Sequence, residues 1–317
     1  MFKIRTPLIK DIKKLEELLK DNSYIQKLNK NKLACILQFL IPYNLRFIPS
    51  IHIALDEKNI LGYVILSCVS KPNNCWQINE IYVFDEARNK GLGEELLRYV
   101  ISVYGSYGIE HFLSEVDSQN FPAVSLFHEC GFRRYARFCF YEKEFDINVL
   151  HEKPLLDKDF ILRQQLLGDL TEIEKLDLSS IPPELRPALG RSKTYFSEKK
   201  DAKVLVERTR NIVIGWAYVQ KLSDNHCFIE LLASPGWTHL YEQFLNTLIC
   251  DCIAFQNNNF KLTVKVFDYI KELTEVLTKS GFLATEVKEL LVRTIWQKVK
   301  ERKLKAARVG VPRAAPT

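Results

Sequence analysis

The chain has 317 residues, of which 47% are apolar and 26% charged, a composition typical of folded globular proteins that excludes wholesale disorder. This length suits two domains, each large enough to bury its own core. The net charge of +6 lies entirely in the last twenty residues, so the other 297 residues sum to zero. A basic, nucleic-acid-binding face on the folded body is therefore not indicated. We expect 299–317 to be a flexible basic tail, the one segment with the charge to contact RNA or acidic lipid.

The cysteines and histidines do not predict a metal site. Eight cysteines and six histidines are scattered without Cys-x-x-Cys or His-x-x-x-His spacing. Thiols embedded in apolar runs indicate a reducing compartment. The charged N-terminus lacks the apolar core of a signal peptide, and no apolar run is long enough to span a membrane. We therefore expect a cytoplasmic protein without a membrane partner, and its oligomeric state stays open.

Apolar spacing over the first 145 residues predicts an α/β domain built on a mixed sheet. In chain order we expect a strand, two helices, three strands, a helix, a strand, a helix and two final strands. The expected ranges are 2–5, 8–20, 25–40, 51–55, 60–69, 78–83, 92–101, 111–116, 121–130 and two segments within 133–145. An aromatic, proline-containing loop at 43–49 follows the second helix.

The turn at 88–93 has the composition of an anion-binding loop. Its sequence, Arg88-Asn89-Lys90-Gly91-Leu92-Gly93, joins an alternating strand to an amphipathic helix. Two glycines let successive backbone amides converge on a phosphate, and the helix N-terminus adds partial positive charge. Glu94 after Gly93 excludes a P-loop, and Leu96 stands where a dinucleotide fingerprint needs a third glycine. An ordinary strand-to-helix turn is the alternative.

A second stretch, from Ser114 to Phe132, decides between these interpretations. The two patterns are Val83-x-x-x-x-Arg88-x-x-Gly91-x-Gly93 and Asn120-x-x-Ala123-x-x-Leu126-Phe127-x-x-x-Gly131-Phe132. Together they resemble the GNAT (GCN5-related) family of acetyl-CoA-dependent N-acetyltransferases. The resemblance covers about the first 145 residues.

The resemblance implies where acetyl-CoA would bind. Its pyrophosphate would lie on the amides of 89–94, and its pantetheine would pair with the strand that contains Val83, as an added strand does. The amide near Val83 would also polarise the thioester carbonyl. The implied cofactor-binding residues are Tyr82, Val83, Arg88, Asn89, Lys90, Gly91, Leu92, Gly93, Glu94, Asn120 and Phe127.

The acceptor expected from the resemblance is an amine on a small molecule, a peptide or protein N-terminus, or a lysine. An alkyl ammonium titrates near 10.4, so a base must remove a proton. Glu115 is the first candidate, because ribosomal-protein N-terminal acetyltransferases of this family carry a glutamate there, and Glu80 is the second. For both, a solvated surface carboxylate is the alternative.

Phe127 departs from the family pattern. A tyrosine usually stands at this position and protonates the departing thiolate, whereas phenylalanine has no hydroxyl. Tyr141 or Tyr135 on the following strands would have to substitute, or the thiol would leave with the help of water.

The pattern then starts again. Phe160-Ile161-Leu162-Arg163 echoes the opening strand, and both Glu80 to Gly131 and Glu230 to Gly281 are separated by 51 residues. We therefore expect two tandem GNAT-like domains, at 1–148 and 149–298. At the offset of 150 residues, the second copy has Thr238, Tyr241 and Gln243 in place of Arg88, Gly91 and Gly93, so its anion site is lost. Binding of a different ligand in the second copy is the alternative.

Three functions remain open at this stage. The first is N-acetyl transfer by the first domain, with a degenerate second domain that has a structural or substrate-shaping role. The second is a non-catalytic module that binds acetyl-CoA or CoA, which Phe127 favours. The third is another acyl transfer, as in the two-domain mycothiol synthases, in which the C-terminal copy is the catalytic one.

Overall fold

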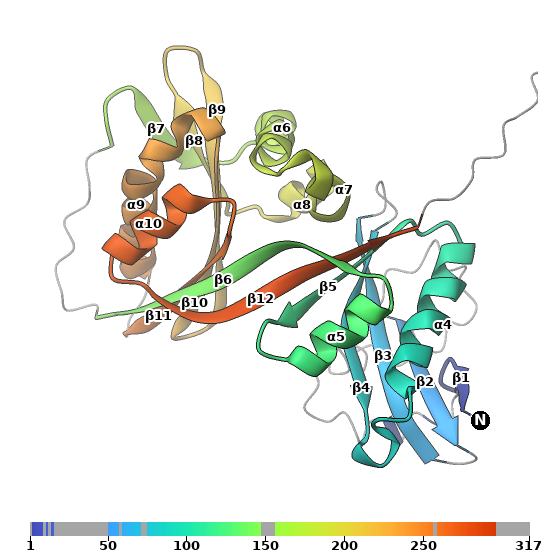
Figure 1. The fold of residues 1–317 in the computed structure, drawn as a ribbon. Coiled ribbons are helices and arrows are strands. Elements are labelled where there is room, and N and C mark those ends of the chain that lie inside the picture. The colour runs from blue at the N-terminus through green and yellow to red at the C-terminus, as the bar shows by residue number, and fades with distance from the viewer. Residues whose placement is uncertain are drawn as a thin grey trace, which may run out of the picture.

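The computed structural model describes residues 2–8, 11, 14, 15, 50–56, 59–70, 75–146, 156–255 and 259–295. Their strands form one continuous mixed sheet of 12 strands, in the order β1-β2-β3-β4-β5-β12-β6-β11-β10-β9-β8-β7 (Figure 1). We call β1 to β6 with their helices the N-terminal half, and β7 to β12 with theirs the C-terminal half.

The N-terminal half follows the expected order through residue 130 wherever the structure describes it. Its α4 buries Leu92, Leu96, Leu97, Val100 and Ile101, the positions that recur at helical spacing. The elements are β1 (Lys3–Arg5), β2 (Ser50–Asp56), β3 (Asn59–Ser70), β4 (Cys75–Val83), the 3₁₀ turn η2 (Asp85–Ala87), α4 (Leu92–Ser106), β5 (His111–Asp117), α5 (Phe121–Glu129) and β6 (Arg133–Phe145).

The C-terminal half repeats this order. Its strands are β7 (Phe160–Gln164), β8 (Lys203–Glu207), β9 (Ile212–Ser223), β10 (His226–Ala233), β11 (Phe260–Phe267) and β12 (Leu283–Thr294). Its helices are α6 (Leu170–Ser180), α7 (Arg186–Leu189), α8 (Lys193–Glu198), α9 (Tyr241–Phe255) and α10 (Lys271–Lys279), with 3₁₀ turns η3 (Leu167–Asp169), η4 (Pro183–Leu185) and η5 (Pro235–Leu240).

The same ion pair closes the first loop of each half. In the N-terminal half Arg5 binds Asp11, whose carboxylate also accepts the backbone amide of Leu8. In the C-terminal half Arg163 binds Asp169, which accepts the amide of Leu166 in the same way. This repeated local structure supports the tandem arrangement.

The last strands of the two halves are exchanged at the centre of the sheet. β12 pairs antiparallel with β5 of the N-terminal half, while β6 pairs antiparallel with β11 of the C-terminal half. β6 and β12 also pair with each other, and they form the long two-stranded ribbon that crosses Figure 1. Each half therefore completes its sheet with a strand from the other half.

The expectation of two strand segments within 133–145 was wrong, because the structure has the single strand β6 there. The stretch contains no glycine, proline or asparagine to make a turn, and its long hydrogen-bonded partners on both sides keep it extended.

The described residues form five buried clusters, and three of them show how the helices and the two halves pack on the sheet. α4 and α5 cover one face of the N-terminal half, and α9 and α10 cover the C-terminal half. The third cluster joins the halves, since Ile181, Leu185 and Ala188 pack on the other face of the N-terminal strands, against Leu113 and Ala136. The segment α6–α7 of the C-terminal half thus covers part of the N-terminal sheet.

Several expectations fall outside the described residues. The expected helix at 25–40, the loop at 43–49 and the tail at 299–317 lie wholly there, as does most of the helix expected at 8–20. The expected domain boundary at 148/149 also lies there and stays a prediction.

Candidate acyl-CoA site

The loop at 88–94 turns the chain sharply between η2 and α4. Asn89 and Gly91 both have positive φ, 60° and 76°, and Gly91 is the N-cap of α4. The first amide that bonds back along the helix is that of Glu95, which donates to the carbonyl of Gly91 at 3.1 Å. The amides of Leu92, Gly93 and Glu94 belong to the first turn and have no intrahelical acceptor. They are the donors that an anion at this helix end would meet.

Glycine is needed at positions 91 and 93 for different structural reasons. A side chain at Gly91 would meet no atom within 4 Å, so the space in front of this residue is open. A Cβ at Gly93 would lie 3.1 Å from Leu126 of α5 and 3.8 Å from Val83 of β4. Gly91 therefore permits the left-handed turn, and Gly93 lets α4, α5 and the end of β4 pack closely together.

The side chains of the two cations of the loop are exposed and make contacts that solvent reaches. Arg88 donates from Nε to the carbonyl of Val83 at 3.1 Å and pairs with Asp85, whose side chain is 82% exposed. Lys90 donates to the carbonyl of Glu86 at 2.8 Å. Solvated contacts of this kind contribute little, so both side chains are available to an anion at low cost.

β4 and β5 separate beside this loop. They pair in parallel only between 75–77 and 111–113. On its other edge β4 has a bulge at Asn79, because the consecutive residues Ile65 and Leu66 of β3 face Glu80 and Ile78. The hydroxyl of Ser114 donates to the carbonyl of Ile78 at 3.0 Å, at the point where the strands part.

The edge of β4 is open along this gap. The amide of Phe84 donates to Leu61 of β3 at 2.9 Å, and backbone amides alternate in direction along a strand. The amide of Val83 therefore points away from β3, toward the gap. Tyr82 lies on the opposite face from Val83, stacks on Tyr63 at 5.7 Å and is 37% exposed.

Glu80 and Glu115 lie on the sheet face opposite α4 and α5. Glu80 accepts a hydrogen bond of 2.5 Å from the hydroxyl of Tyr63, whose ring belongs to the cluster on that face. Glu115 shares its face with Leu113, two residues earlier on β5. Its carboxylate is ion-paired to Lys265 of β11 at 2.5 Å, a contact between the two halves. Both candidate bases are thus hydrogen-bonded in this structure.

Comparison with known proteins agrees with this geometry. Residues 12–132 match the model of the acetyltransferase (GNAT) family. The N-terminal half carries a GNAT-family domain. No curated protein sequence matches the chain.

Solved GNAT structures also resemble the whole chain. A GCN5-related N-acetyltransferase from Sphaerobacter thermophilus is 12% identical, with TM-score 0.59, 94% of this chain and 97% of that chain covered. One from Anabaena variabilis is 12% identical, with TM-score 0.54 and coverages of 93% and 73%. A tandem GNAT protein from the clavulanic acid biosynthesis pathway is 9% identical, with TM-score 0.56 and coverages of 94% and 100%. At these identities the likeness shows the fold: two tandem GNAT-like domains.

Asn120 and Phe127 have structural contacts within the GNAT domain. The side chain of Asn120 is the N-cap of α5 and accepts the amide of Ala123 at 3.2 Å, while the residue itself is exposed. Phe127 is 2% exposed and packs edge-on against Phe132 with ring centroids 4.9 Å apart. Its ring belongs to the core under α4 and α5.

The structure does not bring Tyr141 together with Glu115. Tyr141 lies on β6 and packs on the core of the C-terminal half. Phe138 and Phe140, at the alternate positions of β6, belong to the cluster on the opposite face, where Lys265 lies 3.8 Å above the Phe138 ring. Tyr135 is 41% exposed on the same strand.

The corresponding loop in the C-terminal half is filled by side chains. Its α9 begins at Tyr241, which is 2% exposed, where the GNAT domain has the open position Gly91. The residues at 238 and 243 are threonine and glutamine. The strand separation is nevertheless retained, because β10 and β11 pair only between 226–229 and 261–264. The C-terminal half thus keeps the gap without the phosphate loop.

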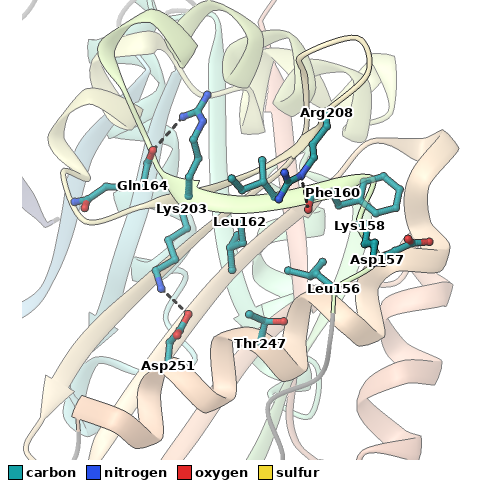
Figure 2. Close-up of a pocket in the computed structure, with 12 residues that line it drawn as sticks. Leu156, Asp157, Lys158, Phe160, Leu162, Gln164, Lys203, Arg208, Thr247 and Asp251 are labelled. Atoms are coloured by element: carbon teal, nitrogen blue, oxygen red, sulfur yellow. Dashed lines mark hydrogen bonds and ion pairs between the residues drawn. The ribbon is translucent and has the colours of Figure 1, made fainter.

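One cavity of about 480 Å³ lies outside both strand gaps, between β7 and α9 (Figure 2). Two of the cations that line it are already paired: Lys203 with Asp251 at 2.5 Å, and Arg208 with the carbonyl of Phe160 at 3.3 Å. Within the described residues, no group of three or more His, Cys, Asp or Glu has the arrangement to hold a metal ion. Among those residues, likewise, no helix has the length and apolarity to cross a membrane.

Sequence reasoning missed the residues that connect the halves. Lys265 stands 150 residues after Glu115, so the repeat offset alone would have matched the two positions. Nothing in the sequence predicts the hydrogen bond between Tyr63 and Glu80.

Proposed function

We propose that the GNAT domain is an acetyl-CoA-dependent N-acetyltransferase that passes acetyl to an amine by direct attack in a ternary complex. The gap between β4 and β5, which opens beside the free N-terminal amides of α4, carries this proposal. An extended chain with a diphosphate at one end matches the open edge of β4 followed by the helix end.

Acetyl-CoA fits the residues present. The amides of 89–94, with Arg88 and Lys90 beside them, would hold the diphosphate, and the open position at Gly91 leaves room for it. The edge of β4 at Tyr82 and Val83 would pair with the pantetheine arm, and the amide group of Asn120 lies at the start of α5. Bound acetyl-CoA supplies the activated acetyl group; the chain supplies orientation and proton transfer.

The base would be Glu115 or Glu80. Both lie on the sheet face that α6–α7 partly covers, so an amine between them would approach the gap from that side. Glu115 must exchange its hydrogen bond with Lys265 for one with the acceptor ammonium, directly or through water. With Phe127 in the core, the leaving thiol has no buried hydroxyl at that position.

The acceptor belongs to the class of primary amines: a small molecule, a peptide or protein N-terminus, or a lysine. The C-terminal half would shape the acceptor side, because its α6–α7 segment and Lys265 reach the face of the two carboxylates. We place the protein in the reducing cytoplasm, because its cysteines are embedded in apolar runs.

The test is release of CoA from acetyl-CoA over a panel of amines, with Gly91→Trp, Glu115→Gln and Glu80→Gln beside the parent. We expect Gly91→Trp to lose both acetyl-CoA binding and turnover. Replacement of the base should keep binding and lower kcat by about 10² to 10⁴, the usual contribution of a general base. Full turnover in Gly91→Trp would contradict the proposal.

A non-catalytic acetyl-CoA or CoA module is the second candidate. The pairing of Glu115 with Lys265 and the phenylalanine at 127 favour it. It predicts no turnover on any amine, yet stabilisation of the fold by about 2.7 kcal/mol when acetyl-CoA is present at 100 times its Kd.

A further inference from the structure

A cavity of about 320 Å³ occupies the strand gap of the C-terminal half, where no phosphate loop is present. Its walls come from β10, from β11 and from the segment between α6 and α8. Among the described residues that line it, Arg191, Glu230 and Lys265 carry charge. Their partners determine which ligand the cavity favours.

Arg191 is shared between two carboxylates. Its guanidinium donates to Asp177 at 2.6 and 3.0 Å, and to Glu230 at 3.0 Å. Asp177 is completely buried, and its other oxygen accepts the backbone amide of Arg191 at 2.9 Å. One positive charge therefore faces two negative charges in a desolvated site.

Lys265 does not supply the missing positive charge. Its ammonium is already neutralised by Glu115 at 2.5 Å. The five groups together, Arg191, Lys265, Asp177, Glu230 and Glu115, thus carry a net charge of −1. Because the dielectric constant inside a protein is low, a charge of this kind attracts a cation more strongly than it would in water.

Glu230 is the group that presents this charge to the cavity. Its side chain is 19% exposed, and it accepts from the hydroxyl of Tyr195 at 2.5 and 2.7 Å as well as from Arg191. Burial, and then the charge of Glu230, raise the pKa of Tyr195, so that hydroxyl stays protonated and donates. These bonds fix the carboxylate, whose two oxygens still have acceptor capacity for a further donor.

Aromatic rings complete the walls. Phe228 lies on the same face of β10 as Glu230, and Phe267 and Tyr269 stack on each other with centroids 5.2 Å apart. Ring faces attract cations and bury apolar bodies. We propose that this cavity binds an organic ammonium ion, with its charge on Glu230 and its body against Phe228, Phe267 and Tyr269.

The test is titration calorimetry on the full chain with butylammonium and 2-phenylethylammonium. Each is compared with its alcohol and its carboxylate counterpart. We expect saturable binding of an ammonium ion and at least tenfold weaker binding of the matched alcohol and carboxylate. Equal or tighter binding of the neutral or anionic counterparts, or no saturable binding of either ammonium ion, would overturn the proposal.

Variants of single carboxylates show which half of the chain binds the ammonium ion. Glu230→Gln keeps the size of the side chain and removes its charge, so affinity should fall at least tenfold. Glu172→Gln, at an exposed position of α6, is the control and should change affinity less than twofold. A larger loss in Glu80→Gln, the matched position in the GNAT domain, than in Glu230→Gln would show that the ammonium ion binds the other half. Because the readout is binding, failure of acetyl transfer leaves the result interpretable.

Phe228→Ala tests the same cavity in case Glu230→Gln does not fold. It removes one ring wall and leaves the ion network of Asp177, Arg191 and Glu230 intact. We expect a several-fold loss of affinity for 2-phenylethylammonium. Parent-like affinity in this variant would also count against the cavity as the site.

Discussion

Glu115 and Lys265 occupy matched positions of the two halves, 150 residues apart, and form an ion pair of 2.5 Å with each other. They reside on β5 and β11, which flank the exchanged strands β12 and β6. The position that offers a candidate base in the GNAT domain therefore offers its counter-charge in the other half. The pair links the sheet face that carries Glu80 and Glu115 to the cavity of the other half.

This ion pair should contribute measurably to stability. Its side chains are 27% and 23% exposed, so it is screened less than a surface pair. A double-mutant cycle with Glu115→Gln and Lys265→Met should give a coupling free energy of about 1 kcal/mol in urea unfolding, the upper end of the range for ion pairs that water still reaches. The helical surface pair of Glu94 and Arg98 serves as control and should give about 0.4 kcal/mol. A coupling no larger than that of the control would contradict this expectation.

The exchange of strands predicts that neither half folds alone. A fragment of residues 1–148 has β5 without β12, and β6 without either neighbour, so a long edge of unpaired backbone groups is exposed. Produced separately, the fragments 1–148 and 149–317 should aggregate or lack native circular dichroism. Produced together, they should form a 1:1 complex in size-exclusion chromatography. A monomeric, cooperatively unfolding fragment 1–148 would show that the exchanged strands are dispensable.

Gly91 and Gly108 allow a controlled test of the loop at 88–94, because the two glycines have similar surroundings and only Gly91 lies in the loop. Both have positive φ, 76° and 90°, and neither has an atom within 4 Å of an added Cβ. Alanine should therefore cost each position about 1–2 kcal/mol of unfolding free energy, because the left-handed conformation disfavours a Cβ. Thermal stabilisation by acetyl-CoA should be lost in Gly91→Ala and kept in Gly108→Ala. Equal responses of the two variants to acetyl-CoA would place the cofactor elsewhere.

The order of helices and strands and the repeat were largely predictable from the sequence, because their signals are local. The helical spacing of α4 and the glycines before it appear in a short window, and the match between Glu80 to Gly131 and Glu230 to Gly281 needs only counting. The exchange of β6 and β12 is a choice of partner between distant strands of similar pattern, and no local signal distinguishes the two pairings.

The candidate site was predictable to the same extent. Backbone conformation at Gly91 follows from glycine in that position, and the structure shows the positive φ. The bulge at Asn79 and the contact between Glu115 and Lys265 depend on tertiary packing. The ionic network of Asp177, Arg191 and Glu230 joins α6, the segment before α8, and β10, and its members are separated by 14 and 39 residues. Ion pairs between residues so far apart in the sequence leave no periodic pattern from which they could be predicted.

The junction of β5 and β12 should weaken as the solution becomes acidic. Burial lowers the pKa of His111 below 6.5, with a smaller opposite effect of Glu110, and its Nδ1 lies 3.2 Å from the hydroxyl of Thr294 on β12. A lowered pKa means that the folded state favours the neutral imidazole, so the unfolded chain binds a proton more readily. The contribution of His111 is present above about pH 6.5 and is lost as the pH falls through its folded value. The difference in unfolding free energy between the parent and His111→Gln should therefore shrink from pH 7.5 to 5, measured by urea denaturation. His239→Gln, at an exposed position, should follow the parent, and a constant difference for His111→Gln over this range would contradict the assignment.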